Sequence, residues 1–217
     1  MNYYYILLCI LIGYLFGSIP IGYLYSLSKG KNIFEEGSKS PGSTNVGRVF
    51  GKKAGNLVFV LDILKTVFGI IFAIIIFMKI ININVYTDYS RAMIIMYTGL
   101  GCIIGHNYPF TTKFKGGKGI ACTCAVILCF CWWLALILYC IHILIKKISN
   151  YVSIASIVAV VLVFVSSLIM IILYVPPYNF EKSYNLLPAT FLMMCLGIFT
   201  HRANIKRLIL GKENKYR

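Results

Sequence analysis

The chain has 217 residues, of which 59% are hydrophobic and only 12% are charged. A soluble globular domain carries about 25% charged residues, so this composition excludes an ordinary soluble domain and favours a protein of the lipid bilayer. The formal net charge is +15, which in a soluble protein would suggest nucleic acid. In a membrane protein the excess of Lys and Arg in cytoplasmic loops explains such a charge first, so we expect no nucleic-acid partner.

Apolar runs long enough to cross the hydrocarbon core, which takes about 20 helical residues, recur along the chain. The first is expected to be a retained span and not a signal peptide, because no small-residue cleavage site follows it and Gly17-Ser18-Ile19-Pro20 interrupts it. Five spans are predicted, over residues 3–27, 57–78, 92–104, 153–174 and 186–200. Short connections with few basic residues, at residues 79–91 and 175–185, separate some of them.

Two charged residues, Asp62 and Lys65, lie inside the second predicted span. At positions i and i+3 they share one helix face and can form an ion pair. Charges at that depth are costly and normally face the interior of a helix bundle. We expect a structural ion pair that braces the functional site, with direct contact to a substrate as the alternative.

Residues 120–145 form one apolar run, and the distribution of basic residues indicates that it turns back on itself. Most of the 21 Lys and Arg residues fall in four segments, at residues 29–55, 105–119, 146–147 and 202–217. A single crossing by the run would place some of these segments outside the cell, against the positive-inside rule. A hairpin of two short or tilted helices turning near residues 130–133 keeps all four inside.

The sequence therefore predicts an all-α integral membrane protein in a single domain over residues 1–217. It predicts seven transmembrane helices, with the N-terminus outside, the C-terminus cytoplasmic and the functional site at the cytoplasmic face. The basic tail at residues 201–217 has apolar residues at helical spacing and should lie along the cytoplasmic interface.

The polar stretch at residues 105–119, GHNYPFTTKFKGGKG, contains no acid. Its cationic or potentially cationic residues are His106, Lys113, Lys115 and Lys118, and the glycines near its end are Gly116, Gly117 and Gly119. Glycine lets backbone N–H groups approach an anion closely, and lysine supplies the matching charge. We interpret the stretch as a phosphate-binding loop. It is not a Walker A loop, because glycine follows Lys118 where that motif needs Ser or Thr, so ATP hydrolysis is not expected.

Two further polar segments should meet this loop at the same interface. The connection at residues 29–55 is rich in Ser, Thr, Asn and basic residues, and Thr44 or Asn45 could cap the helix that follows. In the tail, His201 and Asn204 share a helix face at the end of the last span. Together the three segments offer hydroxyls, amides, an imidazole and cations with few acids. This set suits a substrate with more than one phosphate and does not suit metal-dependent chemistry.

The eight cysteines lie almost entirely inside apolar runs and form no CxxC motif. No histidine stands at ligand spacing from the two CxC pairs. We therefore expect no disulfide and no metal site.

The chain resembles the bacterial acyl-phosphate:glycerol-3-phosphate acyltransferases, the PlsY family, over nearly its full length. The matching blocks are GSIPIGYL, GSKSPGSTNVGRVFGKKAG, LDILK, GHNYPF with KFKGGKG, YVSIASI, and HRANIKRL with GKE. The resemblance implies seven membrane helices and an active site on the cytoplasmic side. It implies transfer of a fatty acyl group from long-chain acyl-phosphate to the sn-1 hydroxyl of glycerol-3-phosphate, giving lysophosphatidic acid and phosphate.

This reaction is the first acylation of phospholipid synthesis in the bacterial cell membrane. The resemblance implies no cofactor, and it implies a functional link to the enzyme that produces acyl-phosphate. A transporter of a phosphorylated metabolite is the alternative function. A transporter should have ionisable groups and broken helices near the membrane midplane, whereas here the polar residues gather at one face.

The resemblance also implies roles for individual residues. The catalytic set it implies is Ser38, Arg48, His201 and Asn204, and the substrate-binding set is Thr44, Asn45, Lys115, Gly116, Gly117, Lys118 and Gly119. Glu213 matches a glutamate usually interpreted as structural. The chain departs from the family pattern at Lys39-Ser40, where many members have Gly-Asn, and at Ala203, where glutamate is common. Two bases remain open for the glycerol hydroxyl: His201, or a phosphate oxygen of the substrate.

Overall fold

The computed structural model describes residues 3–81, 88–177 and 182–215, and the regular structure within these ranges is helical throughout. The helices are α1 (Tyr3–Gly17), α2 (Ile21–Ser28), α3 (Ser43–Phe50), α4 (Lys52–Lys79), α5 (Asp88–Asn107), α6 (Ile120–Phe130), α7 (Trp132–Ser149), α8 (Val152–Ile172), α9 (Leu187–Thr200) and α10 (Arg202–Ile209). Short 3-10 turns at Phe110–Thr112 and Ser183–Leu186 precede α6 and α9. Parts of the predicted connections at residues 79–91 and 175–185 lie outside the described ranges.

Five stretches of the described residues are long and apolar enough to cross a membrane, namely Tyr3–Ser28, α4, α7, α8 and Ser183–Thr200. The helix α6 is apolar but has only 11 residues. The helix α5 has 20 residues and is longer than the predicted 92–104, because it continues through polar residues as far as Asn107. The predicted span is too short because hydropathy marks only the apolar part of a helix, whereas the helix continues through the polar residues beside it.

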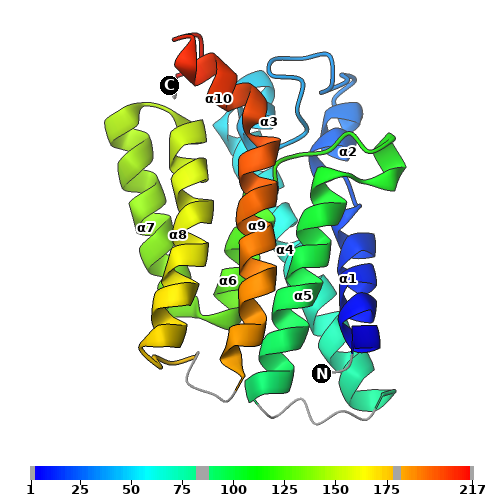
Figure 1. Ribbon diagram of the computed structural model, residues 1–217. Helices are drawn as coiled ribbons and strands as arrows, with labels where there is room; N and C mark the ends of the chain where they lie inside the picture. The colour runs from blue at the N-terminus through cyan, green and yellow to red at the C-terminus, as the bar shows by residue number, and fades with distance from the viewer. Residues whose placement is uncertain (1–2, 82–87, 178–181, 216–217) are drawn as a thin grey trace.

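The predicted break near residues 130–133 is confirmed at Cys131, which separates α6 from α7. Figure 1 shows the result: α6 descends from the loop that follows α5, and α7 rises again beside α8. The end of α7 that carries Lys146 and Lys147 therefore lies at the same end of the bundle as α3, α10 and the glycine-rich loop. The N-terminus lies at the opposite end.

The first predicted span is two helices, since α1 ends at Gly17 and α2 begins after Pro20. Proline lacks the N–H that would continue the hydrogen-bond ladder, so the interruption seen in the sequence becomes a break. In α1, a Cβ on Gly13 would collide with the main-chain oxygen of Thr98, and one on Gly17 with that of Cys102. These glycines let α1 pack backbone to backbone against α5, as small residues do between membrane helices.

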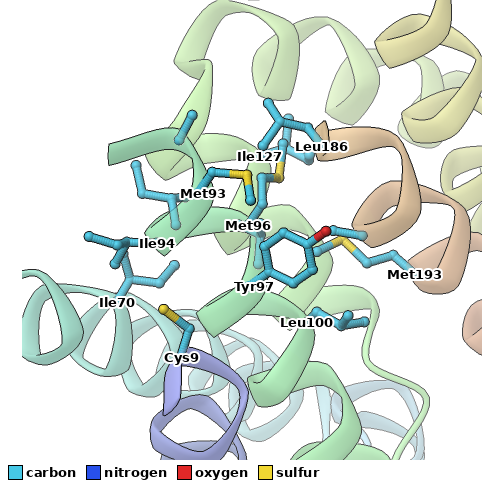
Figure 2. Packing of buried hydrophobic residues seen from close by; sticks show 14 of the residues in the cluster. Cys9, Ile70, Met93, Ile94, Met96, Tyr97, Leu100, Ile127, Leu186 and Met193 are labelled. Atoms are coloured by element: carbon cyan, nitrogen blue, oxygen red, sulfur yellow. The ribbon is translucent and has the colours of Figure 1, made fainter. Parts of the chain in front are cut away.

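The hydrophobic core surrounds α5. Figure 2 shows Met93, Met96, Tyr97 and Leu100 of α5 among side chains from α1, α4, α6 and α9. The Tyr97 hydroxyl donates a hydrogen bond to the Asn185 carbonyl at 3.0 Å, which joins the 3-10 turn before α9 to this core. The helices α7 and α8 pack on each other and on α6 or α9, so they form a separate wall on the other side of α6.

The capping role suggested for Thr44 or Asn45 is wrong. Gly42 occupies the N-cap position of α3, and no side chain caps that helix. All eight cysteines are free thiols. Among the described residues, no group of three or more His, Cys, Asp or Glu side chains could hold a metal ion.

Candidate functional site

A cavity of about 1210 Å³ opens at the basic end of the bundle. Its walls come from α3, α4, α6, α7 and α8, together with the α9–α10 junction and the loop before α6. Ligand sites commonly have volumes of about 300–1,000 Å³, so this cavity has room for more than one small substrate. The polar residues that line it include Ser38, Ser40, Thr44, Asn45, Arg48, Lys52, Lys118, His201, Asn204 and Glu213. The structure thus brings three segments that are distant in the sequence to one site.

A hydrogen-bonded chain joins the glycine-rich loop to the C-terminal segment. The Lys118 ammonium donates to Asn204 Oδ1 at 2.6 Å, and Asn204 Nδ2 donates to Glu213 Oε1 at 2.7 Å. The other carboxylate oxygen of Glu213 accepts a hydrogen bond from Arg207 Nε at 2.7 Å. Both ends of the Asn204 amide are therefore engaged, and Glu213 fixes the orientation in which Asn204 presents its oxygen to Lys118.

Burial and hydrogen bonding set the pKa values of Lys118 and Glu213. Burial lowers the pKa of Lys118 to about 8, against the opposing attraction of the Glu213 carboxylate. Burial alone would raise the pKa of Glu213, but hydrogen bonds from Asn204 and Arg207 outweigh it and hold that pKa below its usual value. Glu213 is therefore an anion near neutral pH, and Lys118 is a cation that an approaching phosphate would stabilise further.

His201 links α9 to α10 and is 2% exposed. Its Nδ1 lies 2.7 Å from the Gly197 carbonyl oxygen, which can only accept, so the ring proton is on Nδ1 and Nε2 is left as an acceptor. Burial, with the nearby Lys118 charge, lowers the pKa of His201 to about 4. The imidazole is therefore neutral near pH 7 and can accept a hydrogen bond from a hydroxyl group.

Asn45 organises the loop that carries Ser38. Its Oδ1 accepts a hydrogen bond from the Ser38 N–H at 2.8 Å, and its Nδ2 donates to the carbonyl oxygens of Glu36 and Ser40, both at 3.0 Å. The side chain is 2% exposed. The Asn45 amide is fully engaged in hydrogen bonds to main-chain groups of the loop. Asn45 therefore holds Ser38 in position at the cavity wall. Thr44 and Arg48 line the same wall.

The glycine-rich loop divides between two environments. Lys118 and Gly119 line the cavity, whereas Lys115 is exposed and outside the lining. A Cβ on Gly116 would collide with the His106 main-chain oxygen, and one on Gly117 with His106 Nε2. The Gly117 N–H also donates to the His106 carbonyl at 3.0 Å. Close packing on His106 therefore accounts for these two glycines, independently of any anion.

The predicted pair of Asp62 and Lys65 is confirmed, with 2.8 Å between Lys65 Nζ and Asp62 Oδ1. The sequence did not reveal its third member: His106 Nδ1 lies 3.1 Å from Lys65 Nζ and 3.4 Å from Asp62 Oδ1. Lys65 also donates to the Ile19 carbonyl at 2.8 Å, in the break between α1 and α2. This buried cluster thus fixes the chain break, the end of α5 and, through His106, the glycine-rich loop.

Three polar residues of α7 were missed by sequence reasoning. Tyr139, His142 and Lys146 share one face of the helix and line the cavity. On the opposing helix α8, Ser153 and Ser156 also line it. A histidine within a predicted span is a signal that could have been used, because ionisable residues there usually face a bundle interior or a cavity.

The fold and the cavity define a helical membrane protein with a basic site at one end of its bundle. The family model described as glycerol-3-phosphate acyltransferase matches residues 7–211. A protein of Staphylococcus aureus (strain Newman) called glycerol-3-phosphate acyltransferase is 36% identical over 212 residues, covering 97% of each chain. One of the same name from Legionella pneumophila (strain Corby) is 34% identical over 207 residues, which is 95% of this chain and 67% of that protein.

Two crystal structures of PlsY (YgiH), described as an integral membrane glycerol 3-phosphate acyltransferase, share the fold. The glycerol 3-phosphate form has a TM-score of 0.78 at 32% identity, covering 98% of this chain and 96% of that chain. The lysophosphatidic acid form has a TM-score of 0.75 at 32% identity, with 98% and 95% covered. The chain therefore belongs to the glycerol-3-phosphate acyltransferase family, as the sequence motifs indicated, and it is a multi-pass membrane acyltransferase.

Proposed function

We propose that this chain transfers a fatty acyl group from acyl-phosphate to the sn-1 hydroxyl of glycerol-3-phosphate in the bacterial cell membrane, releasing phosphate. The observation that carries the proposal is a single cavity with a basic mouth and an apolar interior. Its two acids, Asp62 and Glu213, are both paired with basic side chains, which leaves the lining positively charged. Such a lining fits two phosphorylated substrates, one of which carries an alkyl chain.

We propose a topology of seven spans within one domain over residues 1–217. The five long apolar stretches, with α5 and α6, make up the seven. The basic segments at one end of the bundle support a cytoplasmic position for that end, with the N-terminus outside. Glycerol-3-phosphate would then enter from the cytoplasm, and acyl-phosphate from the bilayer. A functional link to the enzyme that makes acyl-phosphate follows from the need for this donor.

In the proposed reaction the sn-1 hydroxyl oxygen attacks the acyl carbonyl carbon. An ester bond forms, the bond from that carbon to the phosphate oxygen breaks, and phosphate leaves with the electron pair. Arg48 and Lys118 hold phosphate groups, with Thr44 and Gly119 beside them in the cavity wall. Lys115, Gly116 and Gly117 lie outside the lining and support the loop that carries Lys118. The Ser38 hydroxyl stabilises the developing oxyanion, a contribution of about 3 kcal/mol. Asn204 acts by holding Lys118 in place.

The choice of base follows from the protonation of His201. With its pKa lowered to about 4, this imidazole is a weak base near pH 7. The second pKa of a phosphate monoester is about 6, so a substrate phosphate oxygen is the stronger acceptor of the hydroxyl proton. We therefore assign the proton to substrate phosphate and assign His201 Nε2 the task of orienting the hydroxyl by accepting its hydrogen bond.

The test is a product assay on purified protein in detergent, with glycerol-3-phosphate and palmitoyl-phosphate and no membrane gradient. Acyl-CoA and acyl-carrier-protein are supplied in parallel reactions. Release of lysophosphatidic acid from palmitoyl-phosphate alone is the expected result. Product from acyl-CoA only would overturn the choice of donor. No product from any donor, together with uptake of glycerol-3-phosphate into vesicles, would indicate the transporter.

A further inference from the structure

The cavity is closed at its deep end by three residues from three helices. Ile127 of α6, Ala135 of α7 and Val163 of α8 are the lining residues of these helices that lie furthest from the basic mouth. They are 1%, 6% and 4% exposed, and all three belong to the main hydrophobic core. The cavity therefore ends against packed side chains and does not pass through the bundle.

Its depth can be measured along two independent helices. On α8 the lining runs from Val152 to Val163, and on α7 from Lys146 to Ala135. At about 1.5 Å per residue, each of these lengths corresponds to about 16 Å. Both are close to half of the hydrocarbon thickness of about 30 Å. The lower part of this depth is lined by aliphatic residues, among them Leu138, Ala159 and Val160.

We infer that Ile127, Ala135 and Val163 form a floor that sets the length of acyl chain the enzyme prefers. This inference rests on the proposed function, since the occupant of the lower cavity is the alkyl chain of the acyl-phosphate. Each carbon–carbon bond of an extended chain advances about 1.3 Å, so even the full depth of about 16 Å, polar mouth included, accommodates at most about 12 bonds. A longer chain has to bend within the cavity or leave part of its length outside.

Ala135 is the informative position, because its single methyl group leaves space at the floor that a larger side chain would fill. It is held in the first turn of α7, where its N–H donates to the Cys131 carbonyl at 3.0 Å. The adjacent Leu136 is 56% exposed and points away from the cavity. Ala135→Phe therefore places a phenyl ring inside the cavity. Leu136→Phe places the same ring on the same helix turn but outside the cavity.

The experiment compares the two variants with the wild type on acyl-phosphates from about 8 to about 18 carbons long, at saturating glycerol-3-phosphate. We expect Ala135→Phe to shift the preferred chain by about four carbons toward shorter donors. The activity ratio of long to short donors should fall at least about tenfold, with the KM for glycerol-3-phosphate unchanged. Leu136→Phe should retain the wild-type profile.

Val163→Phe repeats the test from another helix and replaces Ala135→Phe if that variant fails to fold. Ile127→Ala should move the preference toward longer chains. An unchanged profile, or an equal loss for all chain lengths, would overturn the inference. Failure of the proposed function gives a different result, since the wild type itself would then form no product from any acyl-phosphate.

Discussion

Replacing Glu213 with glutamine tests how the charge of Lys118 is maintained. The carboxylate opposes the burial that lowers the pKa of Lys118 to about 8. Two hydrogen bonds and one amide group separate the two charges, which allows about 7 Å between them. At an effective dielectric constant near 20, charges at that separation interact by about 2 kcal/mol, equivalent to about 1.5 pH units. Glu213→Gln should therefore lower the pKa of Lys118 toward about 6.5.

The assay is the KM for glycerol-3-phosphate, measured between about pH 6 and pH 9. Protonated Lys118 attracts phosphate, so binding is strong below its pKa and weakens as the pH rises through it. In the wild type this weakening should centre near pH 8, and in Glu213→Gln it should centre at lower pH. The substrate titrates identically in both assays, so the ratio of the two KM values isolates the protein group.

Glu36→Gln is the matched control, because Glu36 is a partly exposed acid that lies outside the cavity and pairs with Lys31 at 3.5 Å. Its KM profile should follow that of the wild type. Identical midpoints for Glu213→Gln and the wild type would refute the reasoning, since they would show that Lys118 is not the titrating group that holds phosphate.

Three further substitutions test the supporting structure. Gly117→Ala places a methyl group on the His106 ring, so Lys118 should shift and the rate should fall at least about tenfold, measured as kcat/KM. Asp62→Asn leaves Lys65 buried without its counter-charge and should cost about 3–5 kcal/mol of folding free energy, seen as a lower Tm in detergent; an unchanged Tm would contradict a structural role for the cluster. Asn45→Ala removes three hydrogen bonds from the loop around Ser38, so kcat should fall more than the KM for glycerol-3-phosphate rises; a change confined to KM would point to direct substrate contact instead.

The helical plan could be predicted from the sequence where it follows from the distribution of charge along the chain or from helix periodicity. Charge distribution required a turn inside the long apolar run, and the structure has it at Cys131. Helix periodicity put Asp62 and Lys65 on one face, and they form an ion pair. Neither inference required knowledge of which helices lie in contact.

Contacts between distant segments could not be predicted in this way. His106 joins Asp62 and Lys65 from another helix, and no spacing rule connects residues so far apart. The role of Gly117 was attributed to an anion, although the space it leaves is filled by the His106 ring. The sequence shows that a small residue is present, whereas only the fold shows what lies against it.

The backbone packing of α1 on α5 has a consequence for how the cavity can open. At Gly13 and Gly17 the main chains of the two helices lie against each other, and this close contact resists sliding of one helix along the other. The wall formed by α7 and α8 lies on the other side of α6, away from that contact. We expect the first half of the bundle to act as a rigid frame. The α7–α8 hairpin is then the part that yields when an alkyl chain enters or a lipid product returns to the bilayer.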